Sequence, residues 1–203
     1  MQRIPLDIVV EDTLSETVFA KLLEHSGKPY VLGACYRKGG FGYIKKNISG
    51  FNRAARGRPF FVLTDLDQYE CAPDLIREWL QEPMTANFVF RVAVREVEAW
   101  LLADRDGIAD FLGVSVQSIP LDAEDIDDPK LLIIQLGRTS RRRDIRADIA
   151  PPTGSTAKQG PDYNARLQSF VMTTWSVDAA CSRSDSLFRA VRRLRTFEPW
   201  TGS

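Results

Sequence analysis

The residues best suited to chemistry are carboxylates that follow short apolar runs of the chain. Glu11 follows the first of these runs, and Asp65 and Asp67 follow the third. Clustered carboxylates repel one another unless a cation lies among them. Mg²⁺ prefers oxygen ligands and typically binds through a few carboxylates together with substrate phosphate. Because His25 is the only histidine, the pattern favours Mg²⁺ or Mn²⁺ over a zinc site built on several histidines.

Two further glutamates are candidates for the same metal shell, and each has a plainer alternative. Glu98 follows the fourth apolar run, where it can complete the shell or help Glu96 to cap the helix that starts there. Glu16 can bind the metal or act as the third residue of a capping box that begins at Thr13. The plainer alternative for Glu11 is an acid at the start of a helix, where the helix dipole favours negative charge.

The apolar runs predict the elements that position these acids. Short β-branched runs bounded by turn residues indicate four strands, at Leu6–Val10, Tyr30–Cys35, Pro59–Thr64 and Asn87–Val94. Helical patterns lie between and after them, at Thr13–His25, Tyr43–Arg56, Pro73–Leu80 and Glu96–Ala103. Strands that alternate with helices and are apolar on both faces predict a parallel sheet covered on both sides. Its carboxyl edge is where the acids should meet a ligand.

The second half of the chain predicts helices only. Helical patterns occur at Ile108–Leu112, Pro129–Leu136, Tyr163–Thr174 and Ser184–Thr196. The fold class expected is therefore α/β, with a mainly parallel four-stranded Rossmann-like sheet flanked by helices and a helical C-terminal half. We predict an α/β core over residues 1–104 and a helical extension over 105–203, packed as a single compact unit. The Pro/Gly/Ser/Thr segment at 150–161 is long for a loop of a compact domain, which points to a functional or disordered segment.

A second group of candidate residues is basic. Five arginines occur within nine residues: Arg138, Arg141, Arg142, Arg143 and Arg146. Arginine binds phosphate through paired hydrogen-bond donors. Neutralising the charge of the phosphate backbone is the dominant contribution to the affinity of a protein for nucleic acid. We interpret this stretch as a nucleic-acid or partner contact. A solvated linker, or a face that docks on the acidic stretch 96–128, is the alternative.

Composition excludes several classes of protein. No run approaches the ~18–20 apolar residues that a membrane span requires, so no membrane association is expected. The first residues have no continuous apolar segment, and no secretory signal is expected. Three cysteines without paired spacing predict free thiols in a reducing cytoplasm.

At the strand-end acids the sequence resembles a Toprim domain, the metal-binding fold of topoisomerases, primases and OLD-family nucleases. That family places a glutamate after its first strand and Asp-x-Asp after its third, which matches Glu11, Asp65 and Asp67. The segments 10–16, 64–67, 95–104 and 184–189 more closely resemble small bacterial Toprim-like proteins, some encoded beside ATPases in suspected phage-defence loci. The family usually has glycine where this chain has Asp12. The resemblance also implies a lysine near the scissile phosphate, for which Lys158 is the candidate.

These features together predict a Mg²⁺- or Mn²⁺-dependent Toprim-like phosphodiesterase, or nuclease, that acts on DNA or RNA. Glu11, Asp65, Asp67 and Lys158 are the expected catalytic residues, and the resemblance implies an anti-phage system with an ATPase partner. The first alternative is a non-catalytic Toprim-like subunit that binds a partner protein or a nucleic acid. A second alternative is a receiver-like or phosphatase acid pocket, which would form a phosphoaspartate at Asp65 or Asp67. A homo-oligomer is compatible with every one of these readings.

Overall fold

The computed structural model describes residues 3–200. The chain divides into two compact units, one formed by residues 1–94 with 188–203 and the other by residues 95–187. These bounds differ from the predicted 1–104 and 105–203, because the end of the chain returns to the first unit. The hydroxyl of Tyr30 donates to the carbonyl oxygen of Phe197 at 2.6 Å. Asn87 and Trp200 exchange two hydrogen bonds of 2.8 Å.

The first unit is built on a four-stranded sheet. The strands hydrogen-bond in the order β2-β1-β3-β4, and every neighbouring pair is parallel. Their bounds are β1 Ile4–Val9, β2 Tyr30–Tyr36, β3 Phe60–Asp65 and β4 Phe88–Ala93. The predicted α/β class, with a parallel Rossmann-like sheet and a helical second half, is confirmed.

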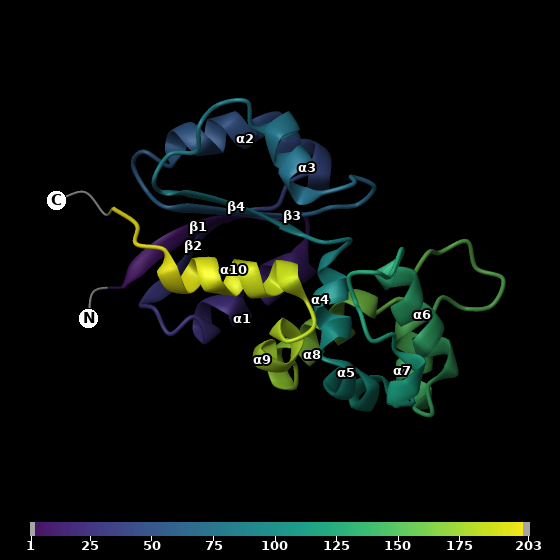
Figure 1. Ribbon diagram of the computed structural model, residues 1–203. Coiled ribbons are helices and arrows are strands. Elements are labelled where there is room, and N and C mark those ends of the chain that lie inside the picture. Colours follow the sequence, from purple (N-terminus) through teal and green to yellow (C-terminus); the bar gives the residue numbers. More distant parts are fainter. Residues whose placement is uncertain (1–2, 201–203) are drawn as a thin grey trace. The chain divides into compact units, whose positions relative to one another are not determined.

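Helices cover both faces of this sheet. Figure 1 shows α2 (Gly40–Ala54) and α3 (Ala72–Trp79) over one face, and α1 (Thr13–His25) and α10 (Asp185–Thr196) over the other. The two faces follow from the alternation of side chains along β3 and β4. On one face Phe90 packs against Trp79 with ring centroids 5.9 Å apart, and on the other Phe61 packs against Phe19 at 4.7 Å.

The helix after β2 begins earlier than its sequence pattern indicates. The helical pattern predicts a start at Tyr43, but α2 begins at Gly40. Its N-cap, Gly39, has a φ of 75°, in the left-handed region that glycine adopts at little cost. Propensity alone did not reveal this start, because three glycines within residues 39–42 lower the helical signal.

The second unit is helical among its described residues. Its elements are α4 (Val97–Ala103), α5 (Arg105–Leu112), the 3₁₀ turn η1 (Val116–Ser118), α6 (Pro129–Thr139), α7 (Arg143–Ile149), α8 (Tyr163–Thr173) and α9 (Val177–Cys181). Helix α4 is buried throughout, and Trp100 at its centre is fully buried. The indole N–H of Trp100 donates to the hydroxyl of Ser186 at 2.7 Å, which satisfies its polar group in the core. The sequence did not predict α7 or α9 as helices.

Two further features of the structure are the character of its helices and the burial of its cysteines. Within residues 3–200, none of the helices has the length and apolar character that crossing a bilayer requires. The three cysteines, Cys35, Cys71 and Cys181, are half-buried thiols.

Candidate active site

The strand order of the first unit creates a switch point between β1 and β3. From β1 the chain passes through α1 to β2 on one side, whereas from β3 it passes through α3 to β4 on the other side. Helices α1 and α3 lie on opposite faces of the sheet (Figure 1). In open α/β sheets, ligands bind in the crevice outside the carboxyl ends of the strands at such a point. The predicted acids follow these two strands: Glu11 comes after β1, and Asp65 ends β3.

Glu11 is tied to the end of β3 by two hydrogen bonds to one oxygen. The hydroxyl of Thr64 donates to Glu11 Oε1 at 2.5 Å, and the backbone N–H of Asp65 donates to the same atom at 2.9 Å. The register explains this contact, since Val9 pairs with Val62. Two residues further along parallel strands, Glu11 comes opposite Thr64. The structure thus brings Glu11 and the backbone of Asp65 together, and it adds Thr64, which was not among the predicted site residues.

The environment of Glu11 opposes a negative charge there. Burial raises the pKa of the Glu11 carboxyl, while the hydrogen bonds from Thr64 and Asp65 act in the opposite direction. The carboxylates of Asp67 and Asp12 raise this pKa further, so both lie within electrostatic reach of Glu11. A cation placed among these groups would remove the repulsion.

Asp67 reaches this edge through its backbone conformation rather than through strand alternation. We predicted that alternation along Asp65–Leu66–Asp67 places both carboxylates on one side. Strand β3 ends at Asp65, Leu66 is buried in the core, and Asp67 has a φ of 48°. A left-handed backbone is costly for a residue other than glycine, although aspartate and asparagine tolerate it better than most. Asp67 is exposed and Asp65 is half-buried, so a ligand from solvent can reach both.

Asp12 and Glu16 have structural partners on α1. Asp12 is the N-cap of α1, and its Oδ1 accepts hydrogen bonds of 2.8 Å from both the backbone N–H and the hydroxyl of Ser15. This capping role accounts for an aspartate at a position where the resembled family has glycine. Glu16 forms an ion pair with Arg37 at 2.9 Å. Glu16 also raises the pKa of the Cys35 thiol, which burial shifts most strongly, to about 11.

Glu98 lies in the second unit, where it belongs to a buried polar group. Its side chain is 4% exposed, accepts a hydrogen bond from the hydroxyl of Tyr163 at 3.2 Å, and forms an ion pair with Lys130 at 3.4 Å. The neighbouring Glu96 accepts a hydrogen bond from the backbone N–H of Lys130 at 3.2 Å. Burial, and then the charge of Glu98, raise the pKa of Glu96 to about 7. Glu96 occupies the N-cap position of α4 but makes no side-chain capping bond there.

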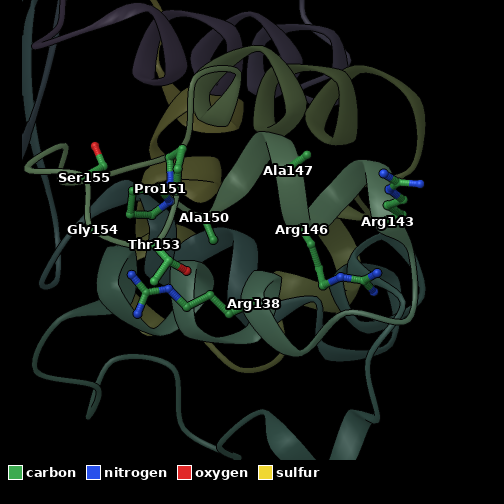
Figure 2. Close-up of a pocket in the computed structure, with 10 residues that line it drawn as sticks. Arg138, Arg143, Arg146, Ala147, Ala150, Pro151, Thr153, Gly154 and Ser155 are labelled. Atoms are coloured by element: carbon green, nitrogen blue, oxygen red, sulfur yellow. The ribbon is translucent and has the colours of Figure 1, made fainter.

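Lys158 also lies in the second unit, in the segment between α7 and α8. Its side chain is exposed. Part of this segment lies beside arginines. Residues Pro151–Ser155 line a pocket together with Arg138, Arg143 and Arg146 (Figure 2).

The five predicted nucleic-acid-binding arginines therefore separate into two sets. Arg138, Arg143 and Arg146 line the pocket, whereas Arg141 and Arg142 are absent from its lining. Arg142 forms an ion pair with Asp144 at 2.8 Å and donates to the carbonyl oxygen of Phe111 at 3.2 Å. Arg142 thus ties α7 to α5. Arg141 is exposed.

Among residues 3–200, no three histidine, cysteine, aspartate or glutamate side chains are arranged closely enough to hold a metal ion as they stand. The acids that fit a divalent cation by chemistry are Glu11, Asp65 and Asp67, whose oxygens are the ligands that Mg²⁺ prefers.

Comparisons of the chain with models of known families, with curated proteins and with solved structures found no match. A function for this protein is therefore inferred from the chemistry of its site.

Proposed function

We propose that the protein is a Mg²⁺- or Mn²⁺-dependent phosphodiesterase that acts on DNA or RNA. The observation that carries the proposal is the position of Glu11 at the β1/β3 switch point, hydrogen-bonded to the Asp65 backbone and electrostatically coupled to Asp67. Glu11, Asp65 and Asp67 would hold the ion. A bound divalent ion would polarise the scissile phosphate and make a bound water more acidic.

The roles of the individual residues follow from their contacts. Thr64 and the Asp65 N–H hold Glu11 Oε1, which orients this carboxylate without a cation present. Asp67 is exposed on the turn after β3, so its carboxylate can approach a ligand that arrives from solvent. The raised pKa of Glu11 supports the proposal, because a site that disfavours its own negative charge gains most from a cation.

A nucleic-acid substrate is supported by the arginine side chains of the second unit. Phosphate recognition by several guanidiniums is typical of proteins that bind a nucleic-acid backbone. The resemblance to Toprim-like proteins extends the proposal to a cytoplasmic protein that acts with an ATPase in phage defence. Lys158 and Glu98 belong to the second unit, so the proposed metal site consists of Glu11, Asp65 and Asp67 alone.

The decisive experiment compares wild-type protein with an Asp65→Ala/Asp67→Ala double variant on labelled DNA and RNA strands. Mg²⁺ and Mn²⁺ are supplied separately, and EDTA serves as the blank. A Glu70→Gln variant is the matched control, because Glu70 is an exposed acid beyond the Asp65–Asp67 segment. The proposal requires metal-dependent cleavage by wild type and Glu70→Gln, and at least a ~100-fold loss in the double variant. Equal cleavage by the double variant would exclude the aspartates from the mechanism.

A second candidate is a non-catalytic subunit that binds a partner protein or a nucleic acid. The observation that favours it is Asp12, whose carboxylate is engaged in capping α1 where the resembled family has an open glycine backbone. This candidate predicts binding of nucleic acid with no cleavage under any metal condition. The same assay therefore separates the two functions when it is run beside a binding measurement.

A further inference from the structure

The pocket between α6, α7 and the loop after α7 has an unusual charge balance. It encloses about 820 Å³ and is lined by ten residues: Arg138, Arg143, Arg146, Ala147, Ala150, Pro151, Pro152, Thr153, Gly154 and Ser155. Three of them carry a guanidinium, and none of the ten carries a carboxylate. Figure 2 shows Arg138 on one side of the pocket, toward Thr153, with Arg143 and Arg146 on the other side and Ala147 and Ala150 between.

Close packing of α6 on α7 creates this arrangement. A Cβ at Gly137 would lie 2.4 Å from Cγ2 of Ile149, so only glycine lets the two helices approach so closely. The next residue on α6 is Arg138, and Arg146 lies one turn before Ile149 on α7. The contact between Gly137 and Ile149 therefore places arginines from two helices around one pocket.

The acids nearest in sequence are paired with other arginines. Asp144 forms ion pairs with Arg142 at 2.8 Å and with Arg166 at 3.2 Å. Asp148 forms an ion pair with Arg166 at 2.5 Å, supported by a second hydrogen bond from Arg166 Nε at 2.7 Å. These pairs satisfy both carboxylates of α7 outside the pocket lining. The positive charge of the three pocket arginines is thus left for an external anion.

One of the three guanidiniums is held in place by the backbone. Nη1 of Arg146 donates to the carbonyl oxygen of Ser140. The hydroxyl of Ser140 in turn accepts a hydrogen bond from the backbone N–H of Arg142 at 2.9 Å. This contact uses one of five N–H donors of Arg146 and limits the motion of its side chain, so its other donors remain for a ligand. The loop adds the hydroxyls of Thr153 and Ser155, both exposed.

We propose that this pocket binds a short single-stranded oligonucleotide through at least two of its phosphates. A single phosphate would contact the arginines of one side, whereas a strand with successive phosphates reaches Arg138 as well as Arg143 and Arg146. The volume suits a ligand of this size, since pockets for small ligands enclose about 300–1,000 Å³. A duplex presents its phosphates on a wide convex surface, which fits a concave pocket poorly. This site belongs to the second unit alone, and it requires no cleavage at Glu11.

Binding is measured by fluorescence polarisation with a labelled single-stranded tetranucleotide, in EDTA so that metal chemistry plays no part. Competitors are inorganic phosphate, pyrophosphate and a short duplex. The variants are Arg138→Ala, Arg146→Ala and their combination, with Arg141→Ala as the matched control outside the pocket. Each pocket variant loses charge-assisted hydrogen bonds to phosphate, so each should raise Kd by at least about tenfold. Arg141→Ala should stay within about twofold of wild type.

The salt dependence gives a second readout that misfolding would not imitate. The slope of log K against log salt is negative, and each lost phosphate contact should make it shallower by about 0.7 for a single strand. Arg146→Lys keeps the charge and should retain the slope while raising Kd. Melting temperatures confirm that each variant is folded. Equal Kd values for wild type and the double variant, an equal effect of Arg141→Ala, or competition by inorganic phosphate as strong as by the oligonucleotide would each overturn the proposal. Failure of the cleavage assay alone would leave it standing.

Discussion

The carboxylate of Glu11 accepts a hydrogen bond of 2.9 Å from the backbone N–H of Asp65, across the junction of β1 and β3. This bond joins the residue after the first strand to the residue that ends the third, 54 positions later in the chain. It fixes one carboxylate at the point of the sheet where α/β proteins bind ligands. It also uses a backbone donor, so any residue at position 65 except proline could supply it.

Replacing Glu11 by glutamine should stabilise the metal-free protein. Glutamine keeps an oxygen that can accept from Thr64 and from the Asp65 N–H, but it removes a charge whose pKa is raised by burial and by Asp67. We expect a higher free energy of unfolding and a higher melting temperature than wild type, measured in EDTA near neutral pH. Thermal melts with and without millimolar Mg²⁺ measure this.

The same melts test the metal site. Wild-type protein should gain melting temperature on addition of Mg²⁺ by mass action, and Glu11→Gln should lose most of that gain. Glu70→Gln should behave as wild type in both conditions. A full Mg²⁺ response in Glu11→Gln would show that this carboxylate is not a ligand.

Two substitutions at Asp67 distinguish the cost of its backbone conformation from the role of its carboxylate charge. Asparagine tolerates the φ of 48° about as well as aspartate, whereas alanine does not. Asp67→Ala should therefore melt about 2–4 °C below Asp67→Asn in the absence of metal, from a cost of about 1 kcal/mol. Both variants should lose the Mg²⁺ response, because both lack the carboxylate. Equal melting temperatures would mean that the left-handed conformation carries no cost.

Stability should depend on the ionisation of Glu96. Its folded pKa of about 7 exceeds the ordinary 4.5, chiefly because of burial and then because of Glu98. The folded state therefore binds more protons than the unfolded state between these values, and stability falls as pH rises from about 4.5 to about 7. Above pH ~7 this contribution is constant.

The test of this dependence is Glu96→Gln. It should flatten the pH profile and raise the free energy of unfolding at pH ~8 by about 1–2 kcal/mol, a value reduced for partial exposure. Urea unfolding at several pH values measures both effects, with Glu70→Gln as the control of matched chemistry. An unchanged slope between pH ~5 and ~7 in the variant would assign the dependence to another group.

Arg91 on β4 lies in a destabilising environment. Its Nε is buried and, within residues 3–200, has no hydrogen-bond partner. Burial lowers the pKa of its guanidinium, and so do Arg193, Arg192 and Arg189. Arg91→Met should raise the free energy of unfolding by about 1 kcal/mol at low salt, because methionine fills similar space without the unsatisfied donor.

The salt dependence distinguishes repulsion from packing at Arg91. Screening by salt should stabilise wild type more than Arg91→Met, so the difference between them should shrink at high salt. Arg53→Met, at an exposed position on α2, is the control and should change stability little. A difference that is independent of salt would indicate that packing alone is responsible.

Periodicity and composition predicted the sheet well, because each strand is apolar on both faces and ends at a carboxylate or a turn. Glu11 could be placed beside Asp65 once β1 and β3 were assumed to be neighbours. The contribution of Thr64 depends on the register of that pair, and a single sequence does not specify register. Likewise, the division of the five arginines depends on the helix α7, whose seven residues with four charges give little periodic signal.

The return of α10 to the first unit makes residues 95–187 an insertion within that unit. During synthesis, all four strands leave the ribosome long before Val191 and Leu194 of α10, which are buried in the finished protein. The sheet face that α10 covers therefore stays uncovered while about 90 further residues are translated. At usual rates, translating them takes about 5–20 s. Because the first unit is interrupted in sequence, it can finish folding only after α10 has been synthesised. A chain truncated before α10 should therefore be bound by chaperones and degraded by proteases.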